Sequence, residues 1–165
     1  MKKRDYTRIL QEGATGSYYV IIQWDRQEDT REFEVVHGPV QLVVDYTAKL
    51  AAEFNINNMG ADMMFLLYPV SPRIANALSD TDQKVIDETV EDIMEYREAI
   101  FSLDACNASD WVHDFIEDTE DDPDAITDAD DFDIDEYNDK PEYKTWAIET
   151  FKEYISRSFR AYTDF

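Results

Sequence analysis

The chain has 165 residues, of which 44% are hydrophobic and 13% aromatic, so it can bury a sizeable core and is unlike a disordered acidic tail. Its formal net charge of −23 argues against direct binding to DNA, RNA or an anionic membrane, because each of these requires an excess of lysine and arginine. With one cysteine and no apolar run long enough to span a bilayer, the sequence predicts a soluble protein of the cytoplasm, or of the host cytoplasm if a phage encodes it.

A β-hairpin is the first predicted element. Residues 17–25 are rich in β-branched and aromatic side chains, and residues 31–36 alternate polar with apolar side chains. The polar residues 26–30 join the two runs. This pattern predicts two antiparallel strands.

A helix and a third strand are predicted next. Pro39 stands where a first helical turn tolerates proline. Apolar residues then recur at helical spacing until residues 55–60 end the element, and they are Leu42, Val43, Tyr46, Leu50 and Phe54. The apolar run of residues 63–70 fits a buried strand or a buried helical turn, and its length and flanking prolines favour a strand.

The second half of the chain predicts helices. Residues 80–101 indicate an amphipathic helix with Ser79 or Thr81 as its N-cap. Its predicted apolar face consists of Ile86, Val90, Ile93, Met94, Arg97 and Phe101. Residues 109–118 predict a short helix anchored by Trp111, Phe115 and Ile116, and a last helix begins at Pro141. Between these two helices, residues 119–139 form an acidic link with few apolar anchors.

These elements predict one α+β domain over residues 1–165. The N-terminal hairpin and the third strand form a small antiparallel sheet, which amphipathic helices cover. Residues 1–79 form a nearly neutral part and residues 80–165 a strongly acidic helical part.

The charge is unevenly distributed along the chain. Residues 1–79 carry ten acids and eight bases, whereas residues 80–165 carry 28 acids and seven bases. Residues 98–139 hold seventeen carboxylates and no lysine or arginine. A compact chain that tolerates such self-repulsion suggests a use for the field outside the molecule, so we expect a cationic partner. The general acidity of a halophilic protein would instead be expected to spread over the whole surface.

Carboxylates form the polar face of the predicted helix over residues 80–101. They are Asp87, Glu88, Glu91, Asp92, Glu95 and Glu98. On a helix they span about 16 Å and lie ~3 Å apart on average along the axis, whereas one strand of B-DNA presents a phosphate about every 3.4 Å. The ordinary solvated face of an amphipathic helix would carry the same residue types, but the helix runs directly into the carboxylate-rich segment.

In this distribution of charge, residues 80–139 resemble the small phage and plasmid proteins that mimic DNA. Those proteins inhibit restriction enzymes, CRISPR effectors, DNA glycosylases or nucleoid proteins by placing carboxylates where phosphates would lie. The resemblance implies a non-enzymatic inhibitor that occupies the positively charged groove of a nucleic-acid-binding protein. The predicted phosphate-mimicking residues are Asp87, Glu88, Glu91, Asp92, Glu95, Glu98, Asp114, Glu117, Asp118, Glu120, Asp121, Asp122, Asp124, Asp128, Asp130 and Asp131.

Aromatic residues near these acids are candidate apolar anchors, because interface energy concentrates in a few such contacts. The candidates are the exposed members among Trp111, Phe115, Phe132 and Tyr137. For Trp111 and Phe115, packing in the core is the competing interpretation.

Little in the sequence indicates catalysis. It contains no glycine-rich phosphate loop, and its only histidines are His37 and His113. A cysteine nucleophile needs a base to activate it, and we expect Cys106 to be a buried structural cysteine instead. We therefore expect neither an enzyme nor a cofactor.

One metal pattern defines an alternative function, a calcium-binding interaction module over residues 131–142. Asp131, Asp133, Asp135, Asp139 and Glu142 fall on positions 1, 3, 5, 9 and 12 of an EF-hand loop, but Glu136 occupies position 6, where the sharp turn needs glycine. A second alternative is an acidic chaperone or adaptor for a basic protein. The sequence leaves open the identity of the partner and whether the chain forms a homo-oligomer.

Overall fold

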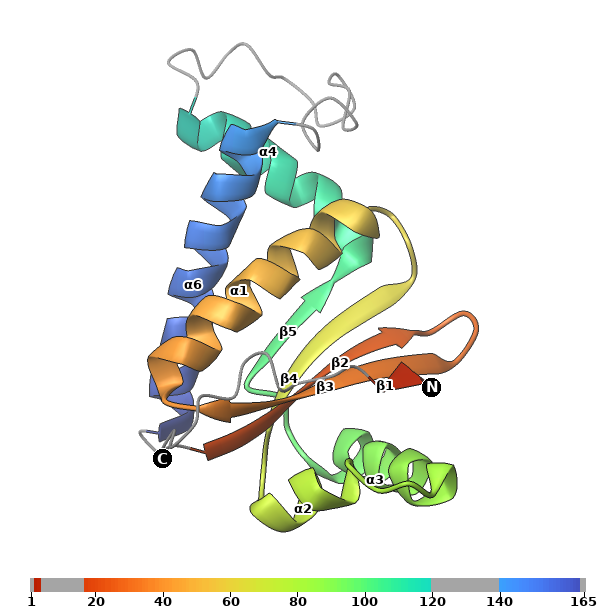
Figure 1. Ribbon diagram of the computed structural model, residues 1–165. Coiled ribbons are helices and arrows are strands. Elements are labelled where there is room, and N and C mark those ends of the chain that lie inside the picture. The colour runs from red at the N-terminus through yellow and green to blue at the C-terminus, as the bar shows by residue number, and fades with distance from the viewer. Residues whose placement is uncertain (1, 4–16, 120–139, 164–165) are drawn as a thin grey trace.

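The computed structural model describes residues 2–3, 17–119 and 140–163. At its centre lies an antiparallel sheet in the order β3-β2-β4-β5, built from β2 (Ser17–Asp25), β3 (Thr30–Gly38), β4 (Met63–Val70) and β5 (Phe101–Asp104). A two-residue strand, β1 (Lys2–Lys3), pairs in parallel with β3 at the edge. The described α-helices are α1 (Val40–Asn57), α2 (Pro72–Ala77), α3 (Gln83–Tyr96), α4 (Ala108–Thr119) and α6 (Pro141–Thr163), and the short 3-10 helix η2 (Ala105–Asn107) precedes α4. The predicted α+β fold, with its sheet covered by helices, is confirmed (Figure 1).

Both faces of the central strands are buried. In β2, residues 19–22 are all buried, and they point alternately into two separate cores. Tyr19 and Ile21 pack with α1 and α6 on one face, whereas Val20 and Ile22 pack with α2 and α3 on the other. A strand covered on both faces needs apolar side chains at consecutive positions, which explains the continuous apolar runs of β2 and β4 in the sequence.

The hairpin, the third strand and three predicted helices are present. β2 pairs with β3 from Ser17 opposite Gly38 to Asp25 opposite Thr30, and β4 pairs with the other side of β2. Pro39 immediately precedes α1, where its extended backbone lets the helix begin at the next residue. The helices predicted over residues 109–118 and from Pro141 correspond to α4 and α6.

The predicted start of the acidic helix is wrong. Neither Ser79 nor Thr81 is the N-cap of α3. Asp82 takes that position, and its side chain accepts a hydrogen bond from the backbone N–H of Lys84 at 3.0 Å. An Asp cap also places a negative charge at the positive end of the helix dipole.

The predicted end of this helix is also wrong. α3 stops at Tyr96, and Arg97 already has extended backbone. Phe101 therefore leaves the predicted apolar face and opens β5, where it pairs with Leu67 of β4. The sequence analysis missed both β5 and α2, a six-residue helix whose cap Ser71 accepts a hydrogen bond from the N–H of Ile74 at 3.2 Å.

A third apolar cluster joins α4 to α6 and α1. Val112, Phe115 and Tyr143 form its buried part. Tyr143 is fully buried, and its hydroxyl accepts a hydrogen bond from Nδ2 of the equally buried Asn55 at 3.1 Å. Burial raises the pKa of Tyr143 to about 12, so the phenol stays protonated over the range in which the protein would be studied.

No helix among the described residues is long and apolar enough to cross a membrane.

The bond between Asn55 and Tyr143 gives the first prediction. Tyr143→Phe leaves a buried amide without its partner, so the free energy of unfolding should fall by about 1–3 kcal/mol in chemical denaturation. Tyr154→Phe is the matched control on the same helix, because Tyr154 is 44% exposed, and it should change stability by less than about 0.5 kcal/mol. Equal losses in the two variants would contradict this role for the hydroxyl.

Candidate partner-binding surface

α3 covers the same face of the sheet as α2 (Figure 1). Its buried side chains Ile86, Val90 and Ile93 recur at helical spacing and pack in one core with residues of β2, β3 and β4. This contact fixes the rotation of the helix about its axis. The charged side of α3 therefore faces solvent.

Carboxylates occupy this outer side of α3. Glu88, Glu91, Asp92 and Glu95 are exposed, and Asp87 is half-buried. Glu98 is exposed in the segment that follows the helix. The structure thus places the five predicted acids from Asp87 to Glu95 on α3, and it places Glu98 two residues beyond the end of the helix, where it lines a pocket with Ser158 and Tyr162 of α6. We call these six residues the α3 acidic row.

Few protein cations neutralise the α3 acidic row. Lys84 Nζ lies 3.9 Å from Glu88 Oε1, and Arg31 Nη1 lies 4.0 Å from Glu91 Oε1. Within the described part of the chain, no lysine or arginine comes within 4.0 Å of the remaining four carboxylates of the row. Both of the observed pairs are long and both carboxylates are solvent-exposed, so each pair neutralises its carboxylate only weakly.

The predicted acids of α4 lie elsewhere. Asp114, Glu117 and Asp118 are exposed, but α4 packs against α6, on the opposite face of the sheet from α3. Desolvation and the nearby charge of Glu117 raise the pKa of Asp114. The Asp118 carboxylate accepts a hydrogen bond from Trp146 Nε1 at 3.1 Å.

Continuity in sequence is therefore not continuity in space. β5 and η2 carry the chain from one side of the sheet to the other, so the α3 acidic row and the acids of α4 form two surfaces. The other predicted phosphate-mimicking residues lie outside the described residues, and they are Glu120, Asp121, Asp122, Asp124, Asp128, Asp130 and Asp131. The same holds for four of the five proposed calcium ligands, and the fifth, Glu142, is exposed in the first turn of α6.

For two of the candidate anchors, Trp111 and Phe115, the competing interpretation of core packing is confirmed. Phe115 is buried against Tyr143, and Trp111 is half-buried with its ring centroid 4.7 Å from that of Phe151, so both belong to the packing of α4 on α6. Phe132 and Tyr137 lie outside the described residues. Tyr96, at the end of α3, is 76% exposed beside the α3 acidic row. The sequence analysis missed it because an aromatic residue in an amphipathic helix usually packs inward.

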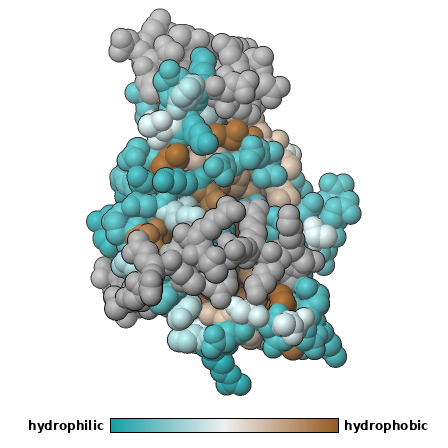
Figure 2. Space-filling view, viewed as in Figure 1, coloured by the Kyte–Doolittle hydropathy of each residue, from teal (hydrophilic) through white to brown (hydrophobic). Residues whose placement is uncertain are grey.

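The surface of α6 differs in character from the outer side of α3. Its charges pair locally, with Lys152 Nζ 3.2 Å from Glu149 Oε1 and Lys144 Nζ 3.8 Å from Glu53 of α1. Arg157 pairs with Glu153 one turn away. Hydrophilic residues also dominate the coloured surface in Figure 2, where hydrophobic residues appear only as small patches. Glu149 and Glu153 of α6 thus have cationic partners close by, which most carboxylates of the α3 acidic row lack within the described part of the chain.

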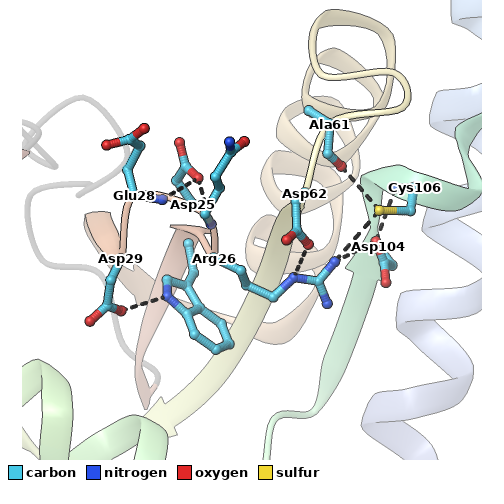
Figure 3. Close-up of polar contacts among 10 residues, drawn as sticks. Asp25, Arg26, Glu28, Asp29, Ala61, Asp62, Asp104 and Cys106 are labelled. Atoms are coloured by element: carbon cyan, nitrogen blue, oxygen red, sulfur yellow. Dashed lines mark hydrogen bonds and ion pairs between the residues drawn. The ribbon is translucent and has the colours of Figure 1, made fainter.

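Cys106 is exposed, so the prediction of a buried cysteine is wrong. Its thiol donates a hydrogen bond to the carbonyl oxygen of Ala61 at 3.3 Å and lies 3.7 Å from Arg26 Nη2 (Figure 3). Local desolvation and the neighbouring Asp104 carboxylate raise the pKa of the thiol. Both effects disfavour the thiolate that a nucleophilic cysteine needs.

Arg26 is the centre of the polar cluster drawn in Figure 3. Its Nε lies 2.6 Å from Asp62 Oδ1 and its Nη2 lies 3.1 Å from Asp104 Oδ1. It thereby ties the turn after β2 to the segment before β4 and to the end of β5. Desolvation opposes ionisation of Asp104, but the hydrogen bonds from Cys106 and the charge of Arg26 prevail and lower the pKa of this carboxyl. The cluster is best explained as a structural clamp.

No protein-family model, curated protein or solved structure gives a significant match to this chain. The resemblance to DNA mimics stays a prediction based on the distribution of charge.

The Arg26 clamp gives the second prediction. Arg26→Ala leaves two neighbouring carboxylates without their cation, so the free energy of unfolding should fall by about 1–3 kcal/mol. Arg73→Ala is the control, because Arg73 is exposed on α2, and it should change stability by less than about 0.5 kcal/mol. If both variants lost the same amount, the clamp would contribute nothing specific.

The third prediction concerns how the difference in stability between the wild type and Arg26→Ala depends on pH. Folding lowers the pKa of the Asp104 carboxyl. Such a group stabilises the folded protein when the pH is above its pKa in the unfolded state, about 3.9. This stabilisation is lost as the pH falls through the lower pKa of the folded state. The stability gap between the wild type and Arg26→Ala should therefore be widest near neutral pH and narrow below about pH 4. A gap that stays constant down to about pH 2 would show that Asp104 is not the responsible group.

Proposed function

We propose that this protein is a non-enzymatic inhibitor that occupies the positively charged nucleic-acid-binding groove of another protein. The α3 acidic row would take the place of a run of backbone phosphates. The observation that supports this proposal is the set of carboxylates that α3 turns outward, most of which have no cationic partner within the described part of the chain.

The spacing of the row suits a site built to bind phosphates. With a rise of ~1.5 Å per residue, the acids from Asp87 to Glu95 span about 12 Å of helix axis. Five carboxylates over that length lie ~3 Å apart on average, close to the ~3.4 Å between successive phosphates along one DNA strand. A cationic groove that follows a DNA backbone would therefore meet a similar density of negative charge.

Repulsion between neighbouring acids of the row works against the helix that carries them. Each pair of like charges three or four residues apart, such as Asp87 and Glu91, destabilises a helix by about 0.2–0.5 kcal/mol. Burial of Ile86, Val90 and Ile93 offsets this repulsion, because each large aliphatic side chain that leaves water contributes about 1.5–3 kcal/mol. The carboxylates are thus tolerated by the fold, and we infer that they act on something outside it.

Tyr96 would provide the apolar contact at the end of the row. Aromatic residues are enriched among the few side chains that dominate interface energy, whereas exposed charges mainly set the association rate. In this proposal, α3 supplies long-range attraction through its acids and short-range affinity through the tyrosine. The acids of α4, on the other side of the sheet, would add only to the overall field.

The fourth prediction tests the α3 acidic row. The protein is immobilised, a cell lysate is passed over it, and the retained proteins are challenged with duplex DNA, single-stranded DNA or RNA. Nucleic acid should release a basic nucleic-acid-binding protein, which is then purified for kinetic measurements. Neutralisation of Glu88, Glu91, Asp92 and Glu95 to the corresponding amides should reduce the association rate at low salt at least about tenfold.

A matched variant controls for total charge. Conversion of four exposed acids on other elements to glutamine removes the same number of charges, and these acids are Glu28, Glu53, Glu142 and Glu149. This variant should retain most of its binding. Equal losses in the two variants would mean that only net charge matters. Failure of every nucleic acid to release the partner would favour an acidic chaperone or adaptor instead.

A further inference from the structure

α4 carries a cluster of potential metal ligands that plays no part in the proposed function. His113, Asp114 and Glu117 lie on neighbouring positions of this helix, and one donor atom from each lies within 4.8 Å of the other two. The imidazole is half-buried and both carboxylates are exposed, so an ion from solvent can reach all three. We call these three residues the α4 triad.

One edge of the triad already has the dimension of a metal site. His113 Nδ1 lies 3.5 Å from Glu117 Oε1. In a tetrahedral zinc site with metal–ligand bonds of about 2.0–2.2 Å, neighbouring donor atoms lie roughly 3.4 Å apart. The spacing of four residues between His113 and Glu117 is what places these side chains one above the other. Only the exposed carboxylate of Asp114 has to adjust to complete the third position.

The imidazole distinguishes this triad from an ordinary acidic cluster. Carboxylates alone suit Ca²⁺ or Mg²⁺, which prefer all-oxygen sites. A mixed set of one nitrogen and two oxygen donors suits Zn²⁺, Co²⁺ or Ni²⁺, because imidazole is a preferred ligand of these ions. The donor set therefore specifies a class of metal as well as a charge.

The surroundings of the triad favour a divalent cation. α4 also carries Asp110 and Asp118 and contains no lysine or arginine. Among the described residues, no lysine or arginine lies within 4.0 Å of Asp114 or Glu117. A metal ion would therefore compete with no lysine or arginine of the described residues, and the net charge of −23 would raise its local concentration.

We propose that His113, Asp114 and Glu117 bind a divalent transition-metal ion of the Zn²⁺ type, with water at its remaining positions. The ion would neutralise the two carboxylates of the triad and fix the His113 imidazole against α4. Such a site differs in place and in chemistry from the calcium loop considered over residues 131–142.

The chain offers a direct readout, because it has only two histidines. In NMR titrations with ZnCl₂, the imidazole signals of His113 should shift at about one equivalent of metal. Those of His37, which stacks on Tyr18 with ring centroids 4.1 Å apart, should not move and serve as an internal control. Equal shifts of the two imidazoles, or no shift of His113, would overturn the proposal.

Variants measured by calorimetry separate this triad from general attraction by acids. His113→Ala and Glu117→Gln should each weaken zinc binding at least about tenfold. Asp110→Asn removes one charge from the same helix but no ligand, and it should change the affinity less than twofold. Circular dichroism would confirm that each variant is folded. Unchanged zinc affinity in folded His113→Ala, or an equal loss in Asp110→Asn, would show that the ion is held by nonspecific negative charge.

Discussion

The structure depends on the burial of both faces of its central strands. Four consecutive buried residues in β2 pack alternately into two cores, so the sheet is stable only with a helical layer on each side. α1, α4 and α6 form one layer, and α2 and α3 form the other (Figure 1). Each layer has one side that packs and one that faces solvent. The fold therefore offers two separate outer surfaces, and the acids of α3 and α4 are divided between them.

This division changes how the charge of the chain is understood. In the sequence, the acids from residue 80 to residue 139 form one nearly continuous series. In the structure, the α3 acidic row presents several carboxylates along one helix with an exposed tyrosine at the end of α3, whereas α4 combines acids with an imidazole. The first arrangement is suited to a long cationic groove. The second is suited to a single small cation, so we propose different ligands for the two acidic surfaces.

The elements that could be predicted from the sequence are those whose signal is local and long. The hairpin runs, α1 and α6 each show a sustained periodicity or a dense β-branched composition, and a core-facing element of that length has few alternative conformations. The five carboxylates from Asp87 to Glu95 could also be placed together, because the helical repeat of Ile86, Val90 and Ile93 fixes which side faces water.

The missed features depend on contacts between distant segments. β5 has only four residues, and Phe101 fits a helical repeat as well as a strand until its pairing with Leu67 of β4 is known. Cys106 was expected inside because free cysteines are commonly buried, but the Arg26 clamp holds its segment at the surface. The separation of α3 from α4 follows from the crossing through β5, and no local pattern encodes it.

The central claim is that α3, and not the acidic series as a whole, forms the partner-binding surface. Hydrogen–deuterium exchange of the free protein and of its complex with a captured basic partner tests this claim most directly, because exchange is resolved along the chain. Backbone amides in and just after α3, over residues 83–98, should exchange more slowly in the complex, while those of α4 stay unchanged. Slower exchange confined to α4 or to the acidic residues that follow it, with none in α3, would contradict the account.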